Sequence, residues 1–349
     1  MTEPSRTVPS KPAPGDRVAV LSPAAGLPEL FPQPFELGLR RLVEEFGLEP
    51  VEYPTTRKMG ASPQERAADL HAAFADPEIK AVIASIGGDD QITVLPHLDA
   101  ELIRANPKPF FGYSDNTNLL MYLSNLGIVA YHGGCAMIEL GRAGEMHPLT
   151  AASVRAALLT NGPFELSPST ETNDVERPWQ DPATFESAPV MLPAEGWSWY
   201  GPERVVEGAA WGGCLDVLSQ LLMAGTHIRP VEEYRGGVLF LETSEQLPSA
   251  DDVYRVLRAM GERGLLGQFP ALLMGRARAW SFDKPLDAEG RAAYRAAQRA
   301  VVLKALAEYA PDTVAVFDVD LGHTDPQQVI PYGGLVRVDA PARRITVHY

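Results

Sequence analysis

The first half of the chain alternates short apolar runs with amphipathic segments, and this alternation restricts the folds that it can adopt. The runs Arg17–Leu21, Lys80–Ile86 and Pro109–Tyr113 are rich in aliphatic and aromatic residues and predict buried strands. Segments with helical periodicity lie between and after them, at Phe35–Phe46, from Ser62 onward, at Asn116–Leu126 and at Leu149–Leu159. Strands and helices that take turns at this spacing favour a parallel, Rossmann-like sheet.

Two of these helices carry local signals. Ser62 and Glu65 have the spacing of a capping box, with proline at the first helical position, so a helix should begin there. The helix at Phe35–Phe46 is predicted to end before Gly47 and to bury one apolar face. That face would consist of Leu39, Leu42, Val43 and Phe46.

Between Pro163 and Pro202 the alternation is interrupted by a segment rich in proline, serine, threonine and acidic residues. A connection of this length without a clear period is typical of a linker or of a functional loop. Its aromatic residues favour a functional loop, because flexible linkers carry few of them. These residues are Trp179, Trp197, Trp199 and Tyr200.

The second half resumes the strand and helix signals. Strands are predicted at Gly237–Glu242, Ala271–Met274, Val314–Val319 and Leu335–Val338, and helices at Leu215–Met223, Asp251–Arg263 and Ala288–Tyr309. At about 150 residues per domain, a chain of 349 residues is long enough for two domains. We expect an α/β protein with an N-terminal Rossmann-like parallel-sheet domain at residues 1–162, a connecting loop at 163–202, and a C-terminal α/β domain with mixed strands at 203–349.

Composition excludes several classes of function. The chain has 30 Lys and Arg residues against 45 Asp and Glu residues, which gives a net charge of −15. Nucleic acid polymers and anionic membrane surfaces attract basic proteins, so we expect neither as a partner.

Two cysteines provide no disulfide framework, and no Cys/His spacing typical of zinc occurs. No apolar run reaches the roughly 18 residues of a membrane span, and Met1–Gly15 lacks the apolar core of a signal peptide, so we expect a cytoplasmic protein.

A candidate nucleophile follows the strand Pro109–Tyr113. Ser114 lies between this strand and a predicted helix, where a sharp turn would project its hydroxyl out of the sheet. The helix N-terminus offers free backbone N–H groups to a developing oxyanion. Gly112 supplies the small residue two positions before the serine, although Asn116 replaces the usual second glycine. The alternative is that Ser114 or Asp115 only caps the helix, and the sequence leaves both interpretations open.

A serine nucleophile needs a base and an acid that orients the base. His323 follows a predicted strand in a turn-rich loop, which is a typical position for a catalytic histidine, and His132 at another strand end is the competing candidate. Glu242 ends the apolar strand Gly237–Glu242. A carboxylate in such a place is costly unless it has a partner, so it fits either the catalytic acid or a structural ion pair.

A glycine-rich turn follows the strand Lys80–Ile86. Gly87 and Gly88 let backbone amides approach a ligand closely and could form an oxyanion hole. The same Gly-Gly-Asp turn resembles the nucleotide-binding motif of NAD kinases and lipid kinases, which makes a phosphotransferase a rival hypothesis. Neither a P-loop nor a dinucleotide fingerprint accompanies it. This rival also leaves Ser114 and His323 without a role.

Six motifs in this order resemble those of the LD-carboxypeptidase family of serine peptidases, and within it the branch of microcin C immunity proteins. The resemblance spans nearly the whole chain. It rests on the segments Asp16–Pro23, Gly87–Asp90, Gly112–Asp115, Trp211–Cys214, Leu239–Glu245 and Gly322–Pro326.

The resemblance implies a Ser-Glu-His triad formed by Ser114, Glu242 and His323. It places the serine in the N-terminal domain and the other two residues in the C-terminal domain, so that the active site lies at the domain interface of a homodimer. The backbone N–H groups of Asp115 and Gly88 would then hold the oxyanion. No cofactor and no metal ion is implied.

The resemblance leaves two kinds of substrate. Immunity-like members cleave the amide between an aspartyl residue and a nucleotide-like group, and wall-recycling members release the terminal D-amino acid from murein tetrapeptides. We expect the first, a small peptidyl-nucleotide, with Trp197 or Trp199 stacking on the base, although packing at the domain seam is an equal alternative for both tryptophans. Cys214 is a further candidate for substrate binding and stands where many relatives carry Asn. A non-catalytic ligand-binding protein is the hypothesis from another class.

Overall fold

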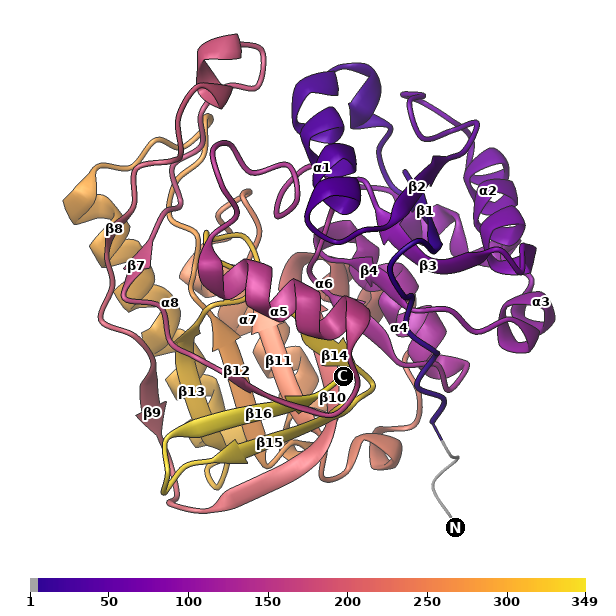
Figure 1. Cartoon of the computed structure of the whole chain (residues 1–349). Coiled ribbons are helices and arrows are strands. Elements are labelled where there is room, and N and C mark those ends of the chain that lie inside the picture. The colour runs from indigo at the N-terminus through magenta and orange to yellow at the C-terminus, as the bar shows by residue number, and fades with distance from the viewer. Residues whose placement is uncertain (1–5) are drawn as a thin grey trace.

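The computed structural model describes residues 6–349 (Figure 1). The first five residues of the proline-rich opening, which we expected to be neither signal peptide nor anchor, lie outside the described residues. Within the described part, no helix is both long and apolar enough to cross a membrane.

The first half forms the predicted parallel sheet. Its strands run side by side in the order β2 (Glu49–Glu52), β1 (Arg17–Leu21), β3 (Ile79–Ala84), β4 (Phe110–Gly112) and β5 (Ala130–His132). The helices of this half are α1 (Pro32–Glu44), α2 (Pro63–Ala75), α3 (Ala100–Ala105), α4 (Thr117–Asn125) and α5 (Pro148–Leu159). Because all strands of this set are parallel, their carboxyl ends meet at one edge, which is where ligand sites form in such sheets.

The second half continues the same sheet. Four parallel strands follow in the order β10 (Val205–Cys214), β11 (Val238–Glu242), β12 (Ala271–Gly275) and β13 (Val314–Val319). Its helices are α6 (Leu215–Ala224), α7 (Ala250–Glu262) and α8 (Ala288–Tyr309). Strand β14 (Ile330–Tyr332) joins the halves, since it pairs antiparallel with β5 and parallel with β10. The predicted fold class is thereby confirmed as mixed α/β with a large, mostly parallel sheet, and Figure 1 shows the two halves side by side.

The last residues of the chain form a second group of antiparallel strands together with the start of the connection. It comprises β15 (Leu335–Asp339), β16 (Arg344–His348) and β6 (Pro163–Leu166), with β15 paired to the first half of β10. The connection 163–202 therefore contains strands that its sequence did not predict. Besides β6 these are β9 (Ser198–Tyr200), which lies at the edge next to β13, and the short pair β7 (Glu171–Thr172) and β8 (Leu192–Pro193). Such strands are too short to produce a readable period and depend on partners far along the chain.

The local helix signals have different outcomes. The Ser62 capping box is confirmed, because its side chain accepts from the Glu65 backbone N–H while the Glu65 carboxylate accepts from the Ser62 N–H. The face predicted for the helix at 35–46 was partly wrong, since Val43 is 52% exposed. The helix begins at Pro32 and presents Phe35, Gly38 and Leu42 to the core, with Val43 rotated away from them.

Candidate active site

Ser114 lies directly after β4 in a strained backbone conformation. Its φ is 61°, in the left-handed region that costs a non-glycine residue about 1–3 kcal/mol. Asn116 stabilises the turn, because its side-chain amide donates to the carbonyls of Ile86 and Tyr113. Gly112 is required here, since a Cβ at this position would lie 2.9 Å from the Asn116 Cβ. The strand-to-helix turn thus presents the Ser114 hydroxyl at the carboxyl end of the sheet.

His323 connects this serine to a buried carboxylate. Its Nε2 is 3.1 Å from Ser114 Oγ, and its Nδ1 is 2.6 Å from Glu242 Oε2. Glu242 is the last residue of β11, while His323 follows β13 in a loop that lies directly on the Glu242 side chain. The close approach depends on Gly322, where a Cβ would meet the Glu242 side chain at 2.6 Å. Because a carboxylate only accepts, Nδ1 carries a proton, and in the neutral imidazole Nε2 can accept from Ser114.

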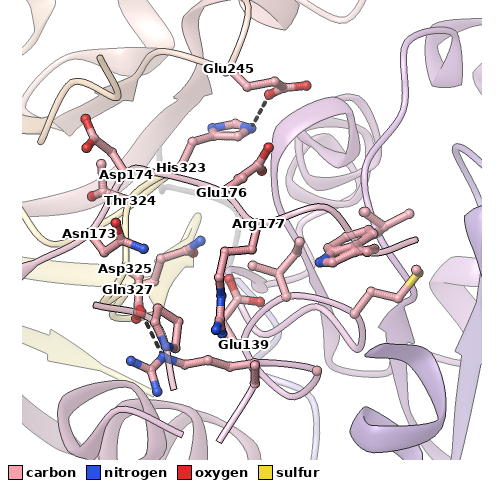
Figure 2. Close-up of a pocket in the computed structure, with 18 of the residues that line it drawn as sticks. Glu139, Asn173, Asp174, Glu176, Arg177, Glu245, His323, Thr324, Asp325 and Gln327 are labelled. Atoms are coloured by element: carbon pink, nitrogen blue, oxygen red, sulfur yellow. Dashed lines mark hydrogen bonds and ion pairs between the residues drawn. The ribbon is translucent and has the colours of Figure 1, made fainter. Parts of the chain in front are cut away.

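Glu242 and His323 shift each other's pKa. Burial acts to raise the pKa of Glu242, but His323 and His132 hold it at about 2. Burial likewise acts to lower the pKa of His323, but Glu242 and then Glu245 raise it to about 9. The Glu245 carboxylate lies 3.2 Å from His323 Nε2 (Figure 2), which is also the nitrogen nearest Ser114 Oγ. The imidazolium form of His323 is therefore strongly stabilised at this site.

A cavity of about 400 Å³ opens over Ser114 and His323. The Gly87–Gly88 turn forms part of its wall, and Gly87 packs so tightly that a Cβ there would lie 2.9 Å from the Ser114 Cβ. Within residues 6–349, no hydrogen bond occupies the Gly88 N–H. The cavity is rich in charged side chains, several of which Figure 2 labels; they include Glu139, Arg142, Asp174, Glu176, Arg177, Glu245, Arg278 and Asp325.

The connection 163–202 provides one wall of this cavity. Its contributions include the run Asn173–Arg177 and the indole of Trp179. Trp179 packs edge-on against Phe31 from the N-terminal half, with ring centroids 5.6 Å apart.

Glu139 also lines the cavity, and burial raises its pKa to about 8. The sequence drew attention to Trp179 as one aromatic residue of the connection, whereas nothing in the sequence singled out Glu139 or Arg177.

The three residues predicted to bind substrate do not line this cavity. Trp197 donates its indole N–H to Asp320 at 2.9 Å, and Trp199 lies in β9 against Val316 of β13. Cys214 is buried at the end of β10, where its backbone N–H donates to Thr117. Trp197 and Trp199 therefore pack within the C-terminal half, and these contacts are not at the seam between the two halves.

The structure also places His132, the acidic end of the Gly87–Asp90 turn and two arginines that follow β12. His132 lies beside Glu242 and not beside Ser114, with its Nε2 3.9 Å from Glu242 Oε1. Asp90 does not line the cavity and forms a bidentate ion pair with Arg66 at 2.8 and 3.0 Å. Of the two arginines after β12, Arg278 lines the cavity, whereas Arg276 pairs with Asp320.

Nothing in the described part of the chain is arranged as a metal centre, since no group of three or more His, Cys, Asp or Glu side chains could hold an ion. What the site does contain is a hydroxyl, an imidazole and a carboxylate in a hydrogen-bonded row. This arrangement suits acyl transfer through a serine nucleophile.

Comparisons with known proteins agree with this chemistry. The LD-carboxypeptidase N-terminal domain matches residues 18–133, and the LD-carboxypeptidase C-terminal domain matches residues 207–338. A Bacillus subtilis protein named "Probable murein peptide carboxypeptidase" is 32% identical over 272 residues, which cover 74% of this chain and 72% of the relative. The microcin C7 self-immunity protein MccF of Escherichia coli is 25% identical over 290 residues, covering 81% of this chain and 78% of MccF.

The fold has a close counterpart among solved structures. An MccF-like protein from Streptococcus pneumoniae, solved in complex with AMP, superposes with a TM-score of 0.83 at 23% identity. The match covers 96% of this chain and 99% of that protein. Both halves of the fold and both halves of the family pattern are thus present, and the chain belongs to the LD-carboxypeptidase family of serine peptidases.

Proposed function

We propose that the protein hydrolyses an amide bond with Ser114 as nucleophile, His323 as general base and Glu242 as the acid that orients His323, without a metal ion or cofactor. The observation that carries this proposal is the hydrogen-bonded row of the three side chains, in which Ser114 and His323 line the cavity and Glu242 is buried behind them. Each partner comes from a different loop or strand end, and a structural ion pair alone would not require the strained backbone of Ser114.

The reaction follows from this geometry. His323 Nε2 takes the proton of Ser114 Oγ as the oxygen attacks the carbonyl carbon, and the resulting imidazolium is stabilised by Glu242. The backbone N–H groups of Asp115 and Gly88 would donate to the oxyanion. His323 then gives its proton to the leaving nitrogen, the amide bond breaks, and water releases the acyl group from Ser114 by the same steps.

For the substrate, we propose the amide between an aspartyl residue and a nucleotide-like group. An aromatic face at Trp179 and two arginines, Arg177 and Arg278, line the cavity and would suit a base and an anionic linker. The AMP complex of the similar Streptococcus pneumoniae protein supports this choice. The second candidate is release of a terminal D-amino acid from murein tetrapeptides, which the Bacillus subtilis relative supports.

A paired hydrolysis assay separates these substrates. Aspartyl sulfamoyl-adenosine and a murein tetrapeptide ending in D-Ala are incubated with the protein in EDTA, and the products are identified by mass spectrometry. Release of the nucleoside part alone supports the proposed substrate. Release of D-Ala alone assigns the protein to the second candidate, and no cleavage of either contradicts both.

Trp179→Ala should weaken binding of the nucleotide conjugate. Loss of one stacking contact costs about 1–3 kcal/mol, so KM should rise roughly 5- to 150-fold while kcat changes little. Trp199→Ala is the matched control, since Trp199 belongs to the same connection but lies outside the cavity. Equal KM values for wild type and Trp179→Ala would contradict a stacking role.

Glu245→Gln should shift the pH dependence of the reaction. The base must be neutral, and the pKa of His323 is raised to about 9, so kcat/KM should increase with pH until about 9. Removing the Glu245 charge removes one cause of that elevation, and the acid limb should move to lower pH. A pH profile of kcat/KM for both proteins measures this, and an acid limb that stays in place would show that Glu245 does not act on His323.

The proposal also covers the domain boundaries, the compartment and the oligomeric state. We propose a cytoplasmic homodimer whose protomers each contain an N-terminal domain (1–162), the connection (163–202) and a C-terminal domain (203–349), as the family resemblance implies. Light scattering coupled to size-exclusion chromatography gives the mass in solution. A mass of 37.9 kDa, that of one chain, would contradict the dimer.

A further inference from the structure

His132 is the second imidazole at the Glu242 carboxylate, and the reaction described above gives it no role. It is the last residue of β5, aligned with Gly112 of β4 on one side and Ile330 of β14 on the other. Its side chain is fully buried. The rings of Tyr113 and Phe240 pack edge-on against it, with centroids 5.8 and 5.1 Å away. This position is at the seam where the two halves of the sheet meet.

The ring nitrogens of His132 and one oxygen of Glu242 are buried, and both groups lack a hydrogen-bond partner in the described part of the chain. Within residues 6–349, neither ring nitrogen of His132 has a hydrogen-bond partner, and neither has Glu242 Oε1. These two groups face each other, with 3.9 Å between Nε2 and Oε1. A buried polar group without a partner loses its hydration and gains nothing in return, so a histidine enclosed by aromatic rings is an unfavourable choice for packing alone. An approach of about 1 Å would turn the contact into a normal hydrogen bond and satisfy both sides.

The two oxygens of Glu242 thus face two different histidines. Oε2 accepts from His323 Nδ1 at 2.6 Å, while Oε1 is directed at His132. A glutamate has three side-chain torsions, so one hydrogen bond leaves its carboxylate plane free to rotate about the last of them. A donor at the other oxygen fixes the plane and limits how strongly the carboxylate attracts the His323 proton.

We propose that His132 is a positioning residue, whose Nε2–H donates to Glu242 Oε1 and holds the carboxylate in the plane that His323 requires. This inference rests on the proposed function, since it assumes that Glu242 and His323 act in catalysis. It assigns His132 a role through Glu242 and no contact with substrate.

Three substitutions at this position separate positioning from packing. His132→Phe keeps the ring volume and removes the donor, His132→Gln places an amide N–H near the position of Nε2, and His132→Asn places it near Nδ1, too short to reach Glu242. Tyr131→Phe is the matched control, because Tyr131 is the preceding residue of β5 and also has a buried hydroxyl without a partner in the described structure.

We expect His132→Phe to lower kcat about 10- to 100-fold with KM unchanged, by analogy with the loss of a group that orients a metal-ligating side chain. The acid limb of kcat/KM should move to higher pH, because a carboxylate without its second donor attracts the His323 proton more strongly. Its thermal midpoint should fall, because the buried Glu242 Oε1 loses the donor that His132 supplies. His132→Gln should recover most of kcat and the wild-type pH limb, whereas His132→Asn should stay impaired and Tyr131→Phe should behave as wild type.

Wild-type kcat and pH limb in His132→Phe would overturn the inference, as would equal impairment of the Phe and Gln variants. If His132→Phe does not fold, the difference between Gln and Asn decides, and no difference counts against positioning. Ser114→Ala is assayed in parallel. If it retains activity, the proposed function itself fails, whereas an inactive Ser114→Ala beside a fully active His132→Phe refutes only the role of His132.

Discussion

Ser114→Ala should abolish turnover of whichever substrate the wild-type protein cleaves, lowering kcat by about 10⁴- to 10⁶-fold. Loss of the nucleophile from a serine triad has an effect of this size because the remaining groups act only through it. Binding should persist, since the cavity walls and the Trp179 face are untouched. The thermal midpoint should change little, because alanine at a φ of 61° has the same backbone strain as serine.

The measurement is single-turnover hydrolysis together with a binding titration of the same substrate. Ser10→Ala, at an exposed serine that does not line the cavity, serves as the control. Residual activity of a tenth or more of wild type would rule out a serine nucleophile at this position. Loss of both binding and activity would instead indicate that the turn had collapsed, which circular dichroism and thermal melting would detect.

Glu242→Gln should have the second largest effect, a loss of about 10⁴-fold in kcat. A neutral amide keeps the shape of the side chain but no longer selects the His323 tautomer or stabilises the imidazolium, which is the known consequence of such a change in a serine triad. The charge that raises the pKa of His323 is also removed, so the acid limb of the residual activity should move to lower pH. Glu308→Gln, at an exposed glutamate bonded to Tyr254, is the control.

Glu242→Gln should also change how the thermal midpoint depends on pH. The pKa of Glu242 is lowered from 4.5 to about 2, so its contribution is present above pH 4.5 and is lost as the pH falls through 2. The pKa of His323 is raised from 6.5 to about 9, so its contribution is present below pH 6.5 and is lost as the pH rises through 9. The difference in thermal midpoint between wild type and Glu242→Gln should therefore be largest between pH 4.5 and 6.5. A difference that stays constant from pH 5 to pH 10 would contradict the ion pair.

Much of the fold could be predicted because its signals are local. The parallel strands have continuous apolar runs, since both faces of such a sheet are covered, and the capping box at Ser62 involves atoms three residues apart. Ser114, Glu242 and His323 could be named for the same reason, because each follows or ends an apolar strand and stands next to residues that permit a sharp turn. Their catalytic roles remain predictions.

Other features depend on contacts between distant segments, which no window of sequence contains. Strand β9 exists because it finds the free edge of β13, and β6 because it finds β16. The tertiary structure also placed Trp179 in the cavity wall and left Trp197 and Trp199 outside it, although all three lie in one connection of similar composition. A side chain's surroundings are set by which elements pack against it, and not by its neighbours along the chain.

His132 and His323 illustrate which features are readable from the sequence and which depend on tertiary contacts. The sequence by itself determined that each of them lies at or after the end of a buried strand and that a carboxylate ends another, because strand formation is readable from short apolar runs. Only the tertiary structure decided that Glu242 Oε2 bonds His323 and that Oε1 faces His132. The physical reason is that strand order and register place these side chains within a few ångströms of each other, and both are fixed by pairings between the two halves of the chain.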